Sequence, residues 1–179
     1  MASRLRLPAV AALLSLLVVA ALVPRTLTWS GAVAPPPLTN TEGSPEALAR
    51  RVIDAMQAGD VGRLRALALT EQEFRAHVWP ELPAARPERN VPFDFVWQRL
   101  AQTSEGHLRQ TLGAVGGAPL TPRRVRFAGE RSQYRDVVVR RRTEIVLAGS
   151  DDSEHVVRLF GSTIEQDGRY KVFSYVVDD

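Results

Sequence analysis

The stretch VVRLFGSTIEQDGRYKVFSYVV, residues 156–177, decides the fold that the sequence predicts. Asp167-Gly168 stands between two runs rich in strand-forming residues, and this dipeptide is a strong signal for a two-residue hairpin turn. Such a turn pairs residues whose numbers sum to 335, and paired residues share one face of the hairpin. The register places Val157, Leu159, Gly161, Thr163, Tyr170, Val172, Ser174 and Val176 on one face, and Val156, Arg158, Phe160, Ser162, Ile164, Lys171, Phe173, Tyr175 and Val177 on the other. Both faces are largely apolar, so we expect both to be covered, one of them by helices.

The hairpin ends a longer region, from Arg123 to Val177, that reads as a meander of about four antiparallel strands. Helices are predicted before it. Ser44, Asp60 and Thr70 are placed to cap three helices, and Thr70 belongs to a capping box that Glu73 completes. Pro92 then opens a longer helical stretch, which we expect Gly106 to divide, with Ser104 as the cap of its second piece. The predicted fold class is therefore α+β, with N-terminal helices packed on a curved antiparallel sheet.

The N-terminal residues have the layout of an export signal. Arg4 and Arg6 precede an uncharged apolar run from Ala9 to Val23, which is short for a membrane span. We interpret residues 1–34 as a cleaved signal peptide or a retained membrane anchor, residues 35–43 as a proline-rich linker and residues 44–179 as the folded domain. In both cases the domain is expected outside the cytoplasm, secreted, periplasmic or anchored, with membrane contact only through the uncleaved segment.

Composition narrows the classes of function. The chain carries 23 basic and 20 acidic residues, and three of the basic ones, Arg4, Arg6 and Arg25, stand before residue 35 without any acid. The domain is thus formally neutral, which argues against a nucleic-acid partner. The chain has no cysteine, and its three histidines lack metal-binding spacing, so no disulfide, metal site or cofactor is predicted.

Two short motifs resemble segments of the NTF2-like superfamily, whose α+β, cystatin-like fold curls a sheet into a cone around the first helix. Residues 58–64, AGDVGRL, resemble the helix-gap-helix segment of SnoaL-like members, and residues 167–172, DGRYKV, resemble their closing strand, with Tyr170 in place of the usual tryptophan. The resemblance covers about residues 45–177. It implies a sheet that curls around the first helix, and a family that contains isomerases, dehydratases, hydrolases and domains with no catalysis, so the fold alone does not decide activity.

Arg141 is the first candidate for a ligand-binding residue. In a continuous strand it shares a face with the set Val137, Val139, Thr143, Ile145 and Leu147. An arginine in that apolar set needs an anionic partner, because burying an unpaired charge is costly. The structural interpretation is an internal salt bridge to Asp54 on the first helix, and the functional one is an anionic ligand. Burial also predicts that Arg141→Ala destabilises the protein more than Arg140→Ala or Arg142→Ala does.

Other candidates are weaker. Tyr170 and Ser174 share the expected inner face and are placed to hydrogen-bond a ligand, although a tyrosine in a closing strand is ordinarily core. His107 is a candidate general base with Asp94 as its partner, but both fit an ordinary helix surface as well. No residue is assigned a catalytic role.

The sequence favours an exported, non-catalytic domain that binds a small hydrophobic or anionic ligand, or a protein partner. One alternative is a SnoaL-like acid-base enzyme of the isomerase or dehydratase type acting on a small hydrophobic substrate, and another is a membrane-tethered interaction module. A homodimer is also predicted, through an outer sheet face composed of Val156, Phe160, Ile164, Phe173, Tyr175 and Val177, because such a patch is large to leave exposed. The segment from Trp79 to Val91, or the helix after it, is the alternative cover for this face.

Overall fold

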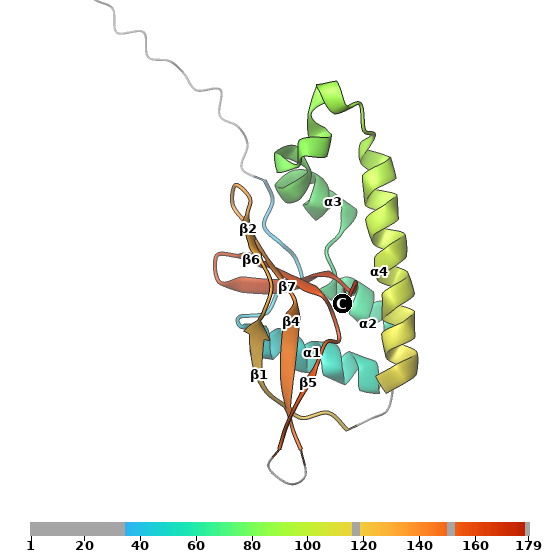
Figure 1. The fold of residues 1–179 in the computed structure, drawn as a ribbon, viewed down its shortest axis with the longest axis vertical. Coiled ribbons are helices and arrows are strands. Elements are labelled where there is room, and N and C mark those ends of the chain that lie inside the picture. Colours follow the sequence, from blue (N-terminus) through green and yellow to red (C-terminus); the bar gives the residue numbers. More distant parts are fainter. Residues whose placement is uncertain (1–34, 116–118, 150–152, 178–179) are drawn as a thin grey trace, which may run out of the picture. The chain divides into compact units, whose positions relative to one another are not determined.

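A computed structural model describes residues 35–115, 119–149 and 153–177, which fold as helices followed by two antiparallel sheets (Figure 1). The predicted leader lies outside these residues. The main helices are α1 (Pro45–Gln57), α2 (Val61–Leu67), α3 (Glu71–Glu73) and α4 (Phe93–Val115). A π-helical turn, η1 (Phe74–Val78), and the 3₁₀ turns η2 (Trp79–Glu81), η3 (Pro83–Ala85) and η4 (Pro87–Arg89) connect α3 to α4. The strands are β1 (Pro122–Phe127), β2 (Arg131–Gln133), β3 (Val138–Arg141), β4 (Thr143–Ala148), β5 (Glu154–Val157), β6 (Ser162–Gln166) and β7 (Arg169–Ser174).

The predicted helix starts are confirmed by their capping bonds. The Ser44 side chain accepts from the backbone of Ala47, the Asp60 side chain accepts from the backbone of Arg63, and Thr70 and Glu73 form the reciprocal capping box. The predicted division of the last helix at Gly106 is wrong, because α4 continues unbroken from Phe93 to Val115. A single glycine costs a helix only about 1 kcal/mol, which packing along its length outweighs.

The hairpin register is confirmed over most of its length. Thr163 pairs with Val172 and Gln166 with Arg169, in the register that sums to 335, and Asp167 and Gly168 both have the positive φ of a tight hairpin turn. A bulge between Ser162 and Thr163 then shifts the pairing, so that Ser162 faces Ser174.

The expected meander of about four strands is wrong, because two of its strands are each broken between two sheets. The order is β1-β4-β5 in one sheet and β2-β3-β6-β7 in the other. Arg142, at φ 51°, separates β3 from β4, and residues 158–161 separate β5 from β6. At this crossing the Thr143 N–H donates to the Gly161 carbonyl over 3.0 Å. The sheets therefore meet at a corner where both chain segments change direction and change sheet.

Two apolar clusters form the core. The first packs α1, α2, β4 and the end of the chain around residues such as Leu48, Ile145 and Tyr175. The second lies under the η turns and the first half of α4, and it includes Phe74, Val139, Ile164, Trp79, Leu82, Trp97 and Phe173.

These clusters overturn the expected outer patch. Phe160, Ile164 and Tyr175 are each at most 1% exposed, while Val156 is 47% exposed. Strand β5 no longer continues into β6, so Val156 leaves the face that contains Ile164. Residues of the η turns and of α4 pack against the cluster that contains Ile164, which is the cover within the chain that the sequence left open. The homodimer stays a prediction, without this patch as its basis.

Part of the predicted linker belongs to the folded unit. Leu38 is buried and its N–H donates to Gln166 Oε1 over 2.8 Å. Further along, Glu42 and Tyr170 exchange backbone hydrogen bonds of 2.8 Å beside β7. Residues 36–42 therefore lie against β7 and α3 and are not a free connection.

Candidate ligand-binding pockets

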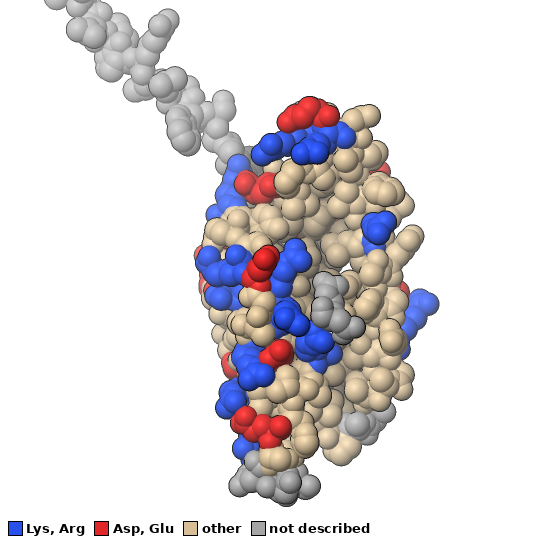
Figure 2. All heavy atoms as spheres, viewed as in Figure 1, with Lys and Arg blue, Asp and Glu red and all other residues tan. Residues whose placement is uncertain are grey.

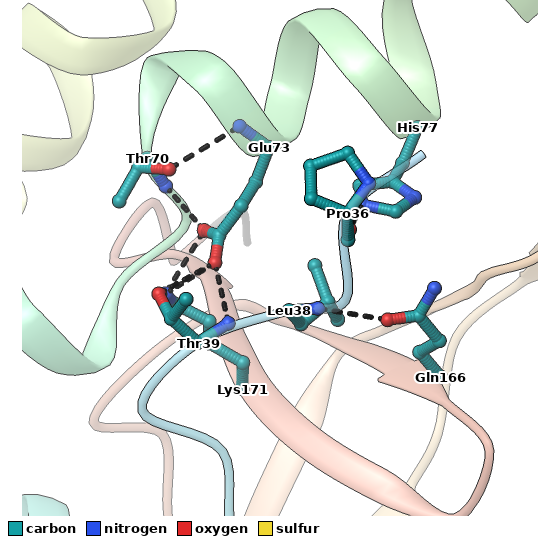
Figure 3. Close-up of polar contacts among 8 residues, drawn as sticks. All are labelled: Pro36, Leu38, Thr39, Thr70, Glu73, His77, Gln166 and Lys171. Carbon is teal, nitrogen blue, oxygen red and sulfur yellow. Dashed lines mark hydrogen bonds and ion pairs between the residues drawn. The ribbon is translucent and has the colours of Figure 1, made fainter. Parts of the chain in front are cut away.

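A buried ion pair between Glu73 on α3 and Lys171 on β7 also binds residues 36–42, which we call the N-terminal segment (Figure 3). Lys171 is fully buried and its Nζ donates to both carboxylate oxygens of Glu73, at 3.0 and 2.9 Å. Thr39 donates its N–H and its hydroxyl to Oε1, and the Thr70 N–H donates to Oε2. Every hydrogen-bonding direction of the carboxylate is thus used within the protein.

The pKa of Glu73 records this environment. Burial alone would raise it, but the backbone donors of Thr39 and Thr70 and the ammonium group of Lys171 outweigh burial and lower the pKa to about 2. A carboxylate held ionised in this way is a poor general base, and it lines neither of the two pockets described below. We therefore interpret the cluster as structural.

His77 forms a second closed cluster beside the first (Figure 3). It is 1% exposed, and its Nδ1 lies 2.9 Å from Asp136 Oδ2 while its Nε2 lies 2.8 Å from the Pro36 carbonyl. The Pro36 oxygen only accepts, so Nε2 carries a proton. Gln166 links this cluster to Leu38, because its amide donates to Asp136 Oδ2 and its oxygen accepts from the Leu38 N–H. This cluster also fastens the N-terminal segment.

An apolar pocket opens between α2, α4 and the end of β7, with a volume of about 170 Å³. One face of α4 supplies Trp97, Leu100, Ala101, Ser104, Glu105 and Leu108, at the spacing of three to four residues that keeps side chains on one side of a helix. Phe173 and Tyr175 form the opposite wall. The pocket lies where the two core clusters meet, since Trp97 belongs to one and Tyr175 to the other.

The polar groups of this pocket are mostly engaged within the protein. The Tyr175 hydroxyl donates to the Leu64 carbonyl over 2.7 Å, and burial raises the pKa of this tyrosine. The Ser104 hydroxyl accepts from the Tyr175 N–H over 2.9 Å. At the rim, Arg65 Nε donates to Glu105 Oε2 over 3.0 Å, and this hydrogen bond lowers the pKa of Glu105. The lining therefore presents apolar surface, one hydroxyl and a neutralised ion pair.

A second, basic pocket of about 410 Å³ opens at the corner between the sheets. We call it the arginine pocket; Arg141, Arg142 and Arg158 line it together with Glu130, Ser162 and the backbone of Gly129 and Gly161. Arg141 and Ser162 are paired residues on β3 and β6. Figure 2 shows that basic side chains gather over the strands, whereas the surface over α4 is mostly uncharged.

The expected burial of Arg141 is wrong. Its neighbours in the predicted face, Val139, Thr143 and Ile145, are buried, but Arg141 itself is exposed because the chain turns at Arg142. Asp54 is also exposed, on the outer side of α1, and within the described residues no ion pair joins it to Arg141. Arg141 nevertheless lines a pocket, as a residue that contacts an anionic ligand would.

The other predicted residues do not gather in one place. Ser174 is buried and pairs with Ser162. Tyr170 is half-buried on β7, where burial and the nearby Glu165 raise its pKa. Asp94 is exposed, with its Oδ1 3.6 Å from Arg75, and none of Asp54, Asp94 and Tyr170 lines either pocket.

His107 lies on α4, where its Nδ1 accepts from the Val177 N–H over 3.4 Å. It too lines neither pocket. The structure thus brings together no acid-base pair from the residues that the sequence had singled out.

Sequence reasoning missed the Glu73–Lys171 pair. The signal was present, because Lys171 is the single lysine of the chain and stands between Tyr170 and Val172 in a strand. The hairpin register placed Lys171 on the outer face, but it could not show that residues 36–42 and α3 cover that face. Ser104 was also misread, as a helix cap, whereas it contacts the end of the chain.

Comparisons with known proteins add no relative. A scan against family models, a search of curated proteins and a search of solved structures each returned no match. Within the part of the chain that the structure describes, no helix is long and apolar enough to cross a membrane, and no three histidine or acidic side chains cluster as metal ligands would.

Proposed function

We propose that residues 45–177 form an NTF2-like domain that binds a small, neutral, apolar molecule between α2, α4 and β7 without chemical conversion. The observation that carries the proposal is the apolar pocket of about 170 Å³, which is lined by Trp97, Leu108, Phe173 and Tyr175 among others. Ligand sites are typically concave, mostly apolar and supplied with few polar groups, and this lining has that composition.

The volume suggests the size of the ligand. An apolar cavity of about 150 Å³ in another protein stays dry and accepts a benzene-sized molecule. The pocket here is slightly larger, so a single aromatic ring with one or two substituents fits it. The Ser104 hydroxyl would orient a polar substituent, and the Arg65–Glu105 pair at the rim would not select for charge because its two charges cancel.

The NTF2-like assignment has three supports. The AGD motif forms the turn between α1 and α2, the DGRYKV motif opens β7, and the chain runs from helices to bent antiparallel sheets. Export, as a secreted, periplasmic or membrane-anchored protein, rests on the leader sequence with Arg4, Arg6 and the apolar run after them.

The test fills the pocket without touching the rest of the domain. In the full chain, Ala101→Leu adds bulk to the pocket lining, and Ala114→Leu adds the same bulk at an exposed position of the same helix. Titration with toluene, followed by amide and indole NMR shifts, should saturate at Trp97 and Ser104 with a dissociation constant between about 10 µM and 1 mM. Ala101→Leu should weaken binding at least tenfold, whereas Ala114→Leu should leave it unchanged.

Non-saturating shifts, or equal binding by the two variants, would exclude this pocket as the binding site. A melting curve of each variant separates lost binding from lost folding.

A further inference from the structure

Within the described residues, two arginines at the corner between the two sheets pair with no glutamate, whereas several arginines elsewhere on the strands do. Arg124 and Arg126 lie on β1 and Arg140 lies on β3, and each pairs with a glutamate of another strand in its own sheet: Glu154 on β5 at 2.8 Å, Glu144 on β4, and Glu165 on β6 at 2.8 Å. These are cross-strand pairs of the kind that stabilise a sheet modestly. These three strand arginines are therefore already partnered.

Arg141 and Arg142 differ from these neighbours. Both are exposed, both line the arginine pocket, and within the described residues neither side chain makes an ion pair or a hydrogen bond. Two adjacent like charges that no acid pairs with repel each other, so a site that keeps them together gains from a bound anion. Glu130, which lines the same pocket, forms no ion pair with either of them.

The backbone holds this arrangement in place. Arg142 has φ 51°, a conformation that side-chain-bearing residues adopt rarely and at a cost, and such residues concentrate at functional sites. The Arg141 N–H donates to the Glu130 carbonyl over 2.9 Å, and the Arg141 carbonyl accepts from the Gly129 N–H over 3.2 Å. The two arginines thus project from a corner whose backbone is hydrogen-bonded on both sides.

Two glycines allow the walls to approach. A Cβ at Gly161 would lie 1.6 Å from the Val176 carbonyl oxygen, and a Cβ at Gly129 would lie 2.9 Å from Arg142 Cγ. Only glycine permits both approaches without displacing backbone or the arginine side chain. The shape of the pocket therefore depends on close backbone packing at the corner. The arginine pocket is distinct from the apolar pocket beside α4.

We propose that the arginine pocket binds a small hydroxylated dianion, a phosphomonoester or a dicarboxylate, through Arg141 and Arg142. Guanidinium groups bind phosphate and carboxylate oxygens through paired N–H donors, which makes arginine suited to either anion. The Ser162 hydroxyl lies in the lining as a further donor, and Glu130 accepts a hydrogen bond from a ligand hydroxyl. A volume of about 410 Å³ accommodates a ligand of that size. The proposal is independent of the function assigned to the apolar pocket.

The test is isothermal titration calorimetry of the full chain. One arm uses sn-glycerol 3-phosphate and the other uses malate, each at low and at high sodium chloride. One of the two dianions should bind saturably, and high salt should weaken its binding because exposed charges are screened. Arg141→Gln and Arg142→Gln should each weaken binding about tenfold or more, the loss expected for a hydrogen bond to a charged group. Glutamine, like arginine, carries a Cβ, so Arg142→Gln changes the charge at position 142 without changing the cost of its positive φ. Arg89→Gln, an exposed arginine on η4, is the matched control and should change binding less than twofold.

Two further variants keep the test decisive. Asp178 and Asp179 follow Val177 in the sequence and lie outside the described residues, so the titrations are repeated on the double variant D178N/D179N, which lacks both of these side-chain carboxylates. If Arg141→Gln does not melt cooperatively, Arg141→Lys replaces it, and the loss of paired geometry with retained charge should still weaken binding. Absence of saturable binding by both dianions in both backgrounds overturns the proposal, and so does equal binding by the Arg141, Arg142 and Arg89 variants.

Discussion

The four-stranded sheet carries charged side chains in two different environments, one buried and paired and the other exposed and without a described partner. Lys171 on β7 is fully buried and paired with Glu73, whose oxygens also accept from Thr39 and Thr70. Arg141, at the end of β3, lies with Arg142 in an open pocket where no described residue pairs with either. A buried charge must be satisfied from within, or folding becomes costly, whereas an exposed charge remains available to a partner. Loss of one partner of the buried pair should therefore cost stability, whereas the exposed arginines are the anion site that we propose.

Breaking the buried pair should have the largest effect. Lys171→Met leaves the Glu73 carboxylate buried without its cation, and we expect a loss of about 3–5 kcal/mol in the free energy of unfolding. The double variant Glu73→Gln/Lys171→Met removes both charges and keeps one acceptor oxygen, which serves the Thr39 donors or the Thr70 donor but not both. Because no buried charge is left unpaired, it should lose less than the sum of the single variants. Chemical denaturation followed by circular dichroism measures all three.

Arg109→Met is the control for an exposed pair, since Arg109 contacts Glu105 on the surface of α4, and it should cost under about 1 kcal/mol. If Lys171→Met cost no more than Arg109→Met, the contrast between buried and exposed charges would be mistaken.

The same pair should make the free energy of unfolding depend on pH in the acidic range. The pKa of Glu73 is about 2 in the folded protein, below its ordinary value of 4.5. The ionised carboxylate therefore stabilises the fold fully at a pH above 4.5. Proton uptake favours the unfolded chain as the pH falls from about 5 towards 2, and about 3 kcal/mol is lost across that range.

Unfolding free energies at pH 7, 5, 4 and 3 should show this decline in the parent protein and a flatter profile in Glu73→Gln. Glu71→Gln, an exposed glutamate of the same helical turn, should leave the profile unchanged. A parent and a Glu73→Gln profile with the same slope would show that another group controls acid stability.

The arginines of β3 should give the smallest effects, in the reverse of the order that the sequence predicted. Arg140→Ala removes the pair with Glu165 and the contact with the ring of Phe127, at 5.1 Å, and should cost about 1 kcal/mol. Arg141→Ala removes an exposed side chain without a described partner and should cost under about 0.5 kcal/mol. Melting temperatures compare the two, and a larger loss for Arg141→Ala would mean that this residue supports the corner as well as lining the pocket.

Local signals in the sequence determined the elements that depend on neighbouring residues. The caps at Ser44, Asp60 and Thr70 and the hairpin turn at Asp167-Gly168 were predicted correctly, because each is formed by residues within a few positions of one another. The class of the fold followed from the same signals, as helices before antiparallel strands.

Only the tertiary structure decided where strands change sheet and which charges find partners. The alternation from Val137 to Leu147 continues through Arg142, so the sequence reads as one strand. In the structure the chain turns at Arg142, because β3 pairs with β6 in one sheet while β4 pairs with β1 and β5 in the other. Lys171 and Glu73 are 98 positions apart and meet through the hairpin, α3 and residues 36–42 together. The arginine pocket arises at the same corner, from residues 128–130, 141–142, 158, 161–162 and 176. Contacts between such distant positions depend on how whole elements pack, and a pattern of neighbouring residues carries no information about that packing.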